Sequence, residues 1–126
     1  MAPNAVGRHV ALIGFMGAGK TTVGEALAKR LGRRFVDVDR EVEQRTGESI
    51  ESLFAQRGEA EFRALEENAA VEALSSAAPA VVALGGGSLG AGRARSALRE
   101  HAFAIHLEVE PDEAWRRVGE PQRVQR

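Results

Sequence analysis

The stretch GFMGAGKTT, residues 14–22, constrains the fold of this chain more than any other feature. It contains the pattern G-x-x-x-x-G-K-[ST], which is typical of a loop that wraps a nucleotide phosphate. The apolar run HVALIG ends at Gly14, and the residues after the loop place Val23, Leu27 and Leu31 at helical spacing. The sequence therefore predicts a strand, a glycine-rich loop and a helix in direct succession.

The residue types of this loop suit a phosphate group. Glycine has no Cβ and adopts positive φ freely, so successive backbone N–H groups can turn toward one anion. A helix that begins near Lys20 directs its unpaired N–H groups to the same point, where Lys20 adds a full charge for the β- and γ-phosphates. The Thr21 hydroxyl can ligate Mg²⁺. The alternative, a glycine-rich turn with a surface lysine, is disfavoured by the spacing and the flanking elements.

Apolar periodicity and the glycine and proline boundaries predict the order of the remaining elements. Strands are expected at 34–39, 80–84 and 102–109, and the unbroken apolar run at 80–84 is typical of a central strand. Helices are expected at 40–47, 49–58, 59–78, 90–101 and 110–119. This alternation indicates one α/β domain over residues 1–126, with the three-layer P-loop architecture and a mainly parallel sheet. No final strand follows to cover the sheet edge, so we expect the domain to be incomplete at its C-terminus.

Composition excludes several classes of function. The chain has 126 residues, a formal net charge of −1 and 28% charged residues, so it carries no overall field for nucleic acid or a membrane surface. It has no cysteine, which excludes disulfides, thiolate metal sites and cysteine nucleophiles. No run approaches the roughly 18 apolar residues that a membrane span needs, and no signal peptide is apparent. We expect a cytoplasmic protein without nucleic-acid or membrane partners.

Two aspartates follow the second predicted strand. Asp37 and Asp39 are two residues apart, so on an extended strand they share one face near its carboxyl end. Ligands bind at that end in open α/β sheets. One carboxylate could hold the water shell of magnesium while the other accepts a hydrogen bond or a proton from a substrate hydroxyl. The alternative is a pair of solvated or helix-capping aspartates.

Arg63 is flanked by acidic residues at helical spacing. Glu59, Glu66 and Glu67 stand at i−4, i+3 and i+4 from it, on one face of the predicted helix. The pattern fits an exposed, salt-bridged helix, and it fits equally a braced guanidinium that presents its planar fork to a carboxylate. The residues alone leave both interpretations open.

The glycine run after the third predicted strand is a second candidate for close ligand approach. GGGS at 85–88 follows the apolar run directly, and either a ligand contact or a tight turn explains it. The histidines share no metal-ligand spacing, and the tryptophan has no aromatic partner in its helix. We therefore interpret His9, His101, His106 and Trp115 as structural.

Taken together, the motifs resemble those of the shikimate kinase family. The set G-F-M-G-A-G-K-T-T, F-V-D-V-D, R-T-G, G-E-A-E-F-R-A-L-E and A-L-G-G-G-S occurs in this order, and the likeness extends from about residue 9 to residue 118. The resemblance implies ATP-dependent phosphorylation of the 3-hydroxyl of shikimate, with Mg²⁺, on a P-loop kinase fold with five parallel strands. It implies small-molecule substrates, and we expect a monomer.

The resemblance also implies a role for each matching residue. ATP is expected to contact Gly17, Ala18, Gly19, Lys20, Thr21, Thr22 and, in the lid-like stretch GEPQRVQR, Arg123. Thr21 and, through water, Asp37 are expected to hold the magnesium ion. Asp39 is expected to bind the shikimate hydroxyls and act as base, with Lys20 as the second catalytic residue. Arg63, oriented by Glu66, is expected to bind the shikimate carboxylate, while Gly86 and Gly87 contact the ring hydroxyls.

The chain departs from the family pattern at its C-terminal end. Family members carry a complete lid, a further carboxylate-binding arginine, a last strand and an adenine-contacting loop, and we expect these to be missing here. Arg123 is followed by Val124 and Gln125, where the family has proline and leucine. Two other functions therefore remain open, a nucleotide-binding module without turnover and a related small-molecule kinase such as gluconate kinase.

Overall fold

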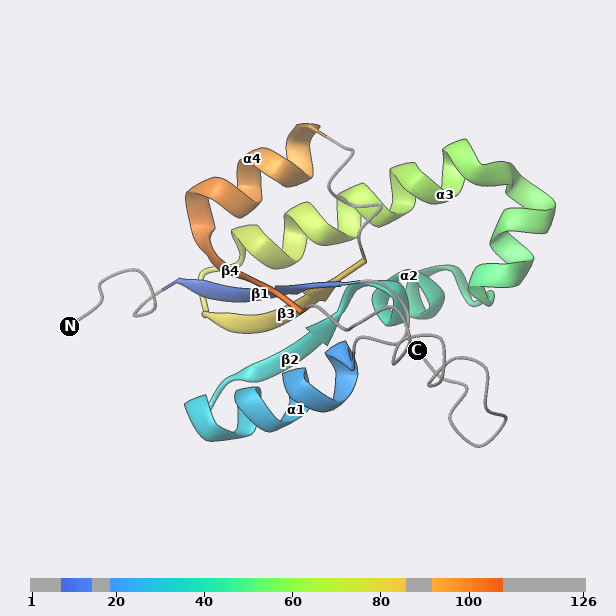
Figure 1. The fold of residues 1–126 in the computed structure, drawn as a ribbon. Helices are drawn as coiled ribbons and strands as arrows, with labels where there is room; N and C mark the ends of the chain where they lie inside the picture. Colours follow the sequence, from blue (N-terminus) through green and yellow to red (C-terminus); the bar gives the residue numbers. More distant parts are fainter. Residues whose placement is uncertain (1–7, 15–18, 86–91, 108–126) are drawn as a thin grey trace.

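The protein is described by a computed structural model that covers residues 8–14, 19–85 and 92–107 (Figure 1). Its centre is a parallel sheet whose described strands run in the order β2-β3-β1-β4. The strands are β1 (His9–Ile13), β2 (Arg34–Asp37), β3 (Ala80–Leu84) and β4 (Ala102–His106). The helices are α1 (Lys20–Leu31), α2 (Val38–Thr46), α3 (Ile50–Ser75) and α4 (Gly92–His101). The expected α/β architecture with a parallel sheet is confirmed.

Helices cover both faces of the sheet, with α1 on one side and α3 and α4 on the other (Figure 1). Alternate residues of β1 serve the two layers, because successive side chains of a strand point to opposite faces. Val10 and Leu12 belong to the core beneath α1, whereas Ala11 and Ile13 belong to the core beneath α3 and α4. All five residues of β1 are buried, as are all five of β3. The expectation that 80–84 is a central strand is therefore confirmed.

Two glycines end helices at the positions that the sequence predicts. Gly32 follows α1 with φ 66° and its N–H bonds back to the carbonyls of the last turn, and Gly47 follows α2 with φ 72°. Gly58 has φ 87° and ψ 165° and interrupts α3, so the chain there forms two helical arms, 50–57 and 59–75. This agrees with the two predicted helices on either side of Gly58, although the second arm ends three residues before the predicted boundary.

The second strand is shorter than predicted, which is a correction to the sequence analysis. We expected an extended strand through Asp39, but β2 ends at Asp37 and α2 begins at Val38. The physical cause is a helix cap, because the Asp37 carboxylate accepts hydrogen bonds from the N–H groups of Asp39 and Arg40. Val38 is buried in the core in the first turn of α2, so its apolar character serves a helix and not the strand.

Some predicted elements lie outside the described residues. These are the glycine loop at 15–18, the glycines at 86–91 and everything from 108 onward, including the helix expected at 110–119. The strand expected at 102–109 is described through His106. Among the described helices, none combines the length and the apolar character that a membrane crossing requires.

Candidate active site

Three strand ends meet at one edge of the sheet. Because the strands are parallel, their carboxyl ends share that edge, where Asp37 is opposite Ala83 and Ile13 is opposite Leu84. Each strand leads directly into a segment that was predicted to bind a ligand: β1 into the phosphate loop, β2 into the aspartates and β3 into the glycine run. The fold therefore brings these three sequence motifs together at the position where open α/β sheets bind ligands.

The start of α1 is arranged to receive an anion. Gly19 occupies its N-cap with φ 83°, has no side chain to cap the helix, and is followed by a first turn without acidic residues. The positive end of the helix dipole at this turn therefore favours a negative group. The Lys20 ammonium donates to the Gly14 carbonyl at the end of β1. This contact directs the lysine ammonium toward the carboxyl end of β1, and its contact with the β- and γ-phosphates stays a prediction.

A hydroxyl and a carboxylate stand together beside this helix start. Thr21 Oγ1 lies 3.5 Å from Asp37 Oδ2, while Asp37 Oδ1 accepts from the Asp39 N–H at 3.1 Å and the Arg40 N–H at 3.4 Å. Hard oxygen donors of this kind suit Mg²⁺, which keeps several waters and uses one or two protein ligands together with substrate phosphates. In the described part of the chain no three His, Cys, Asp or Glu side chains form a metal-binding cluster. The pair therefore fits a magnesium ion that is shared with a nucleotide.

Asp39 lies in the first turn of α2 and not on the strand that carries Asp37. The sequence analysis placed both carboxylates on one strand face, and that geometry is wrong. The two residues nevertheless remain adjacent, because the Asp37 side chain binds the Asp39 N–H. Asp39 is half-buried at the same edge of the sheet as the phosphate loop. Asp39 is thus carried by α2 and not by β2, and its role toward a substrate hydroxyl stays a prediction.

Arg63 is held by carboxylates on its own helix. Its Nη1 lies 2.9 Å from Glu66 Oε1 and its Nε 3.6 Å from Glu59 Oε2. The hydrogen bond to Glu66 raises the pKa of Arg63 above the ordinary value for arginine, so the guanidinium stays charged. Glu66 is buried, with its side chain 5% exposed, whereas the Arg63 side chain is 43% exposed. A buried carboxylate thus orients a cation that still faces solvent, which is the geometry of a braced anion clamp.

The Glu66 carboxylate connects this clamp to the end of β3. A Cβ added to Gly85 would lie 3.8 Å from Glu66 Oε2, so the Arg63–Glu66 pair sits against the start of the glycine run. Glu67, the third acidic neighbour that the sequence offered, does not brace Arg63. Its carboxylate accepts from the Arg93 N–H at 3.1 Å and caps the start of α4.

Two aromatic rings complete the surroundings of Arg63, and the sequence analysis did not identify them. The guanidinium carbon lies 5.9 Å from the centre of the Phe54 ring and 5.5 Å from that of Phe62, within the range of cation–π contacts. The rings themselves are 4.7 Å apart. Phe62 could have been noticed as the neighbour of Arg63, but Phe54 lies on the other arm of α3, and no local spacing connects it to the arginine.

The remaining predicted residues are placed as follows. Thr22 is exposed in the first turn of α1. Outside the described residues lie Gly17, Ala18, Gly86, Gly87, Trp115 and Arg123. His9 is structural as expected, since it is buried and bonded on both ring nitrogens to backbone groups. His101 and His106 are both exposed.

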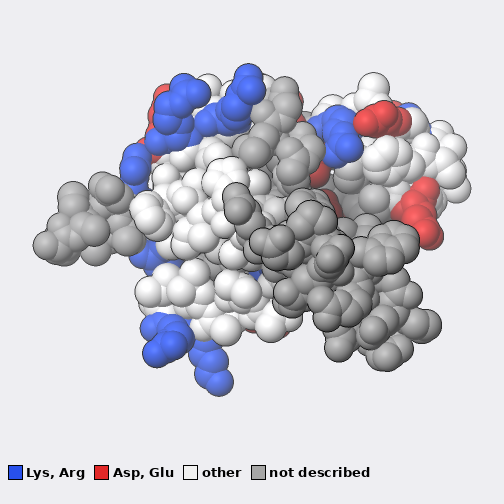
Figure 2. All heavy atoms as spheres, in the orientation of Figure 1, with Lys and Arg blue, Asp and Glu red and all other residues white. Residues whose placement is uncertain are grey.

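Charge on the described surface is distributed in separate groups. In the view of Figure 2, basic side chains gather over α4 and at the far end of α1, and they do not merge into one continuous basic face.

A cavity of about 280 Å³ lies among α2, α3 and the start of α4. Its arginines are already bonded, Arg45 to Glu72 at 2.7 Å and Arg93 to Asn68 at 3.0 Å. No predicted site residue of the described segments lines this cavity.

These features define the class of the protein. A parallel sheet with helices on both faces, a glycine-rich loop between β1 and α1, and an oxygen pair beside the helix start together make a P-loop kinase fold. The Arg63–Glu66 pair lies on α3, a different helix from α1, which carries Lys20 and Thr21.

Comparison with known proteins identifies the family. The shikimate kinase family model matches residues 16–126, and the chain belongs to this family. It is 50% identical over 108 residues to the shikimate kinase of Thermobifida fusca and 44% identical over 105 residues to that of Geobacillus thermodenitrificans. These matches cover 86% and 83% of this chain but 62% and 56% of the relatives, so the chain spans less than two thirds of their length.

A solved structure agrees with this assignment. The shikimate kinase of Acinetobacter baumannii, determined in complex with shikimate, superimposes with a TM-score of 0.85 at 36% identity. The match covers 94% of this chain and 65% of that structure.

Proposed function

We propose that this chain carries the phosphoryl-transfer site of an ATP:shikimate 3-phosphotransferase. The observation that carries the proposal is the pairing of Arg63 with the buried Glu66 against the end of β3, at the sheet edge that also holds Lys20, Thr21 and Asp37. A phosphate-binding loop alone would serve any nucleotide-binding protein. A fixed cation beside it suits a second substrate that is itself a carboxylate.

The substrates are assigned to the two parts of the site. The triphosphate of ATP is bound by the loop and the first turn of α1, through Gly17, Ala18, Gly19, Lys20, Thr21 and Thr22, with Arg123 as a further contact from the lid-like stretch. Shikimate is bound with its carboxylate on Arg63 and its hydroxyls on Asp39, Gly86 and Gly87. Membership of the shikimate kinase family and the position of Arg63 support this assignment.

The reaction follows from this placement. Asp39 accepts the proton of the shikimate 3-hydroxyl while the oxygen of that hydroxyl forms a bond to the γ-phosphorus of ATP. The bond from that phosphorus to the β–γ bridging oxygen breaks, which releases ADP. Lys20 and the loop N–H groups stabilise the charge on the transferring group. Thr21 and, through water, Asp37 would hold Mg²⁺, which supplies charge neutralisation at the phosphates when bound. Arg63 holds the shikimate ring so that the 3-hydroxyl is aligned for attack on the γ-phosphorus.

Coupled measurement of ADP release tests the proposal. The unsubstituted chain should release ADP only when both shikimate and Mg²⁺ are present. Replacing Arg63→Ala should raise the KM for shikimate about 10- to 100-fold, as expected for the loss of a charge-assisted hydrogen bond, and leave the KM for ATP within about twofold. Arg45→Ala is the matched control, since Arg45 also bonds two carboxylates but lies away from the sheet edge.

Two results would contradict the proposal. Nucleotide binding by calorimetry without shikimate-dependent turnover would indicate a binding module. Turnover with an unchanged KM for shikimate in Arg63→Ala would contradict the role of Arg63 as a carboxylate clamp and favour a related small-molecule kinase such as gluconate kinase. We further propose a monomeric cytoplasmic protein that folds as one domain, which gel filtration and cell fractionation can test.

A further inference from the structure

The bend in α3 divides the helix into two arms that carry different parts of the shikimate side of the site. Gly58 stands at the bend with φ 87° and ψ 165°, a conformation that side chains rarely adopt. The second arm carries Phe62, Arg63 and Glu66, whereas the first arm, 50–57, carries Phe54. Because the backbone at Gly58 is not helical, regular helix geometry does not set the angle between the arms, and contacts across the bend can fix it.

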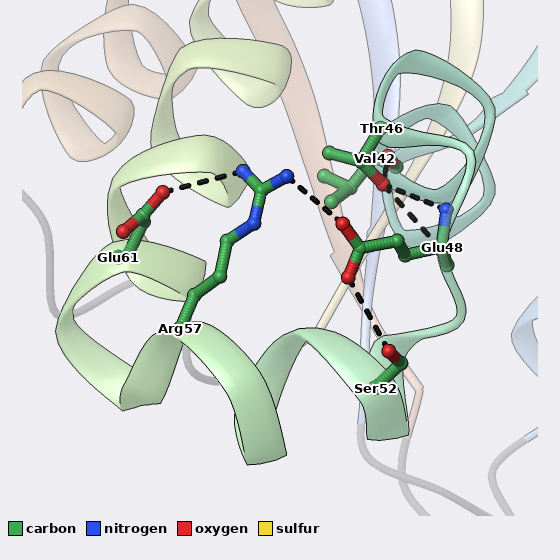
Figure 3. A network of polar contacts seen from close by, with 6 residues as sticks. All are labelled: Val42, Thr46, Glu48, Ser52, Arg57 and Glu61. Carbon is green, nitrogen blue, oxygen red and sulfur yellow. Dashed lines mark hydrogen bonds and ion pairs between the residues drawn. The ribbon is translucent and has the colours of Figure 1, made fainter.

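Arg57 spans the bend (Figure 3). It is the last residue of the first arm, and its Nη1 lies 3.2 Å from Glu61 Oε2 on the second arm. Its Nη2 lies 2.9 Å from Glu48 Oε2, in the loop that precedes α3. The second Glu48 oxygen accepts from the Ser52 hydroxyl at 3.3 Å. We call the four side chains Glu48, Ser52, Arg57 and Glu61 the Arg57 clasp.

The clasp is anchored on α2. The Glu48 N–H donates to Thr46 Oγ1 at 3.2 Å, and that hydroxyl donates to the Val42 carbonyl at 2.9 Å (Figure 3). Val42 is buried in the core, and α2 begins at the Asp37 cap. A continuous set of contacts therefore links α2 to the first arm of α3 and, through Arg57, to the second arm.

The first arm brings one ring to the clamp. Leu53 is fully buried and fixes this arm to the core, while Phe54 remains 37% exposed and packs against Phe62. The Arg63 guanidinium lies over both rings. A change in the angle at Gly58 would move Phe54 relative to Arg63 and Phe62, and so would change the surface on which the guanidinium rests.

We propose that Arg57 is a positioning residue for the second substrate: by bridging Glu48 and Glu61 across the bend at Gly58, it holds Phe54 against Arg63 and so sets the affinity for shikimate. The substrate part of this inference rests on the proposed function. Arg57 touches neither substrate in this account and acts through the first arm of α3. Lys20, Thr21 and Thr22 lie on α1, outside these contacts, so we expect the binding of ATP to be independent of the clasp.

Arg57→Gln tests the inference with two readouts. Hydrogen exchange of the amides of 50–57 should become faster, with little change in the amides of 64–75. The KM for shikimate should rise about two- to fivefold, the range expected from loss of a partly exposed ion-pair network, while kcat and the KM for ATP stay within about twofold. Arg45→Gln, which removes the same charge and a similar pair of carboxylate contacts from α2, should leave both readouts unchanged.

A charge exchange tests whether the effect passes through Glu48. Arg57→Glu alone should speed the exchange of 50–57 and raise the KM for shikimate more than Arg57→Gln does, because it places three carboxylates together. The double variant Glu48→Arg with Arg57→Glu re-forms the contact in reverse and should recover at least half of the change in exchange and in KM. Equal behaviour of the single and double variants would contradict the clasp.

The possible failures are distinguishable. Unchanged exchange of 50–57 in Arg57→Gln would overturn the inference whether or not the chain turns over. Faster exchange with an unchanged KM for shikimate, in a chain that phosphorylates shikimate, would overturn the positioning of Arg63. Absence of shikimate-dependent turnover in the unsubstituted chain would refute the proposed function together with the substrate part of this inference, and the exchange experiment would still decide whether the clasp fixes the arm.

Discussion

His9 makes two hydrogen bonds to backbone groups, one buried and one partly buried. The residue is 3% exposed at the start of β1. Its Nδ1 accepts from the Ala80 N–H at 3.0 Å, so the ring proton is on Nε2, which donates to the Ser76 carbonyl at 3.0 Å. The imidazole thus joins β1 to the first residue of β3 and to the C-cap of α3. Replacing His9→Ala removes both partners at once.

The size of the effect follows from the two backbone groups that lose their partners. A buried donor or acceptor without a hydrogen bond costs about 1–3 kcal/mol. The Ala80 N–H is such a buried group, whereas the Ser76 carbonyl is only partly buried, so the two together would cost less than about 6 kcal/mol, and a water that enters the vacated space can lower the sum further. We therefore expect His9→Ala to lower the free energy of unfolding by about 2–4 kcal/mol, a large share of the roughly 5–15 kcal/mol that holds a typical domain.

Urea unfolding followed by circular dichroism measures this change from the midpoint at constant m. His9→Leu keeps most of the volume and loses both bonds, so it should destabilise nearly as much as His9→Ala. His101→Ala serves as the control, because that side chain is 47% exposed and should change stability by less than about 0.5 kcal/mol. An unchanged free energy of unfolding in His9→Leu would refute this prediction, since it would show that His9 stabilises the fold by packing and not by hydrogen bonding.

Two further predictions concern the packing of α1 and the proposed magnesium ligand Thr21. Gly24→Ala places a Cβ against the Phe35 ring, closer than two carbon atoms can approach, so the ring or α1 must shift, and thermal unfolding should show a loss of about 1–3 kcal/mol, while Gly92→Ala, with no atom within 4 Å, should show none. Thr21→Val keeps the shape of the side chain and removes the oxygen beside Asp37. We expect its kcat to fall at least about tenfold with an unchanged midpoint of unfolding, and an unaltered dependence of activity on Mg²⁺ would exclude Thr21 as a ligand.

The elements that could be predicted from the sequence are those whose signal is local. The central strand needs only its apolar run, and the ends of α1 and α2 need only their glycines. The second strand was predicted too long because Val36 and Val38 alternate with aspartates, as strand residues do. That alternation does not reveal which aspartate caps the helix. In the structure Asp37 is the cap, because its side chain accepts hydrogen bonds from two N–H groups of α2.

The part of the site that could not be predicted depends on contacts between distant elements. Helical spacing does not distinguish among the three possible partners of Arg63, which are Glu59, Glu66 and Glu67. Burial separates them, since Glu66 packs beside Gly85 at the end of β3 while Glu67 caps α4. Phe54 and the Arg57 clasp depend on the angle at Gly58, and a sequence indicates that a glycine bends the chain without giving the direction of the bend.

The pairing of β1 has a consequence for how this chain acquires its structure. Its first strand pairs with β3 on one side and with β4 on the other, so both neighbours are synthesised long after it. A nascent chain that has left the ribosome as far as α3 therefore exposes both edges of an apolar strand, in the state that is prone to aggregation. Such nonlocal pairing also slows folding, because loop closure must precede every strand contact. β1, although it is synthesised first, gains its strand partners only when β3 and β4 have been synthesised.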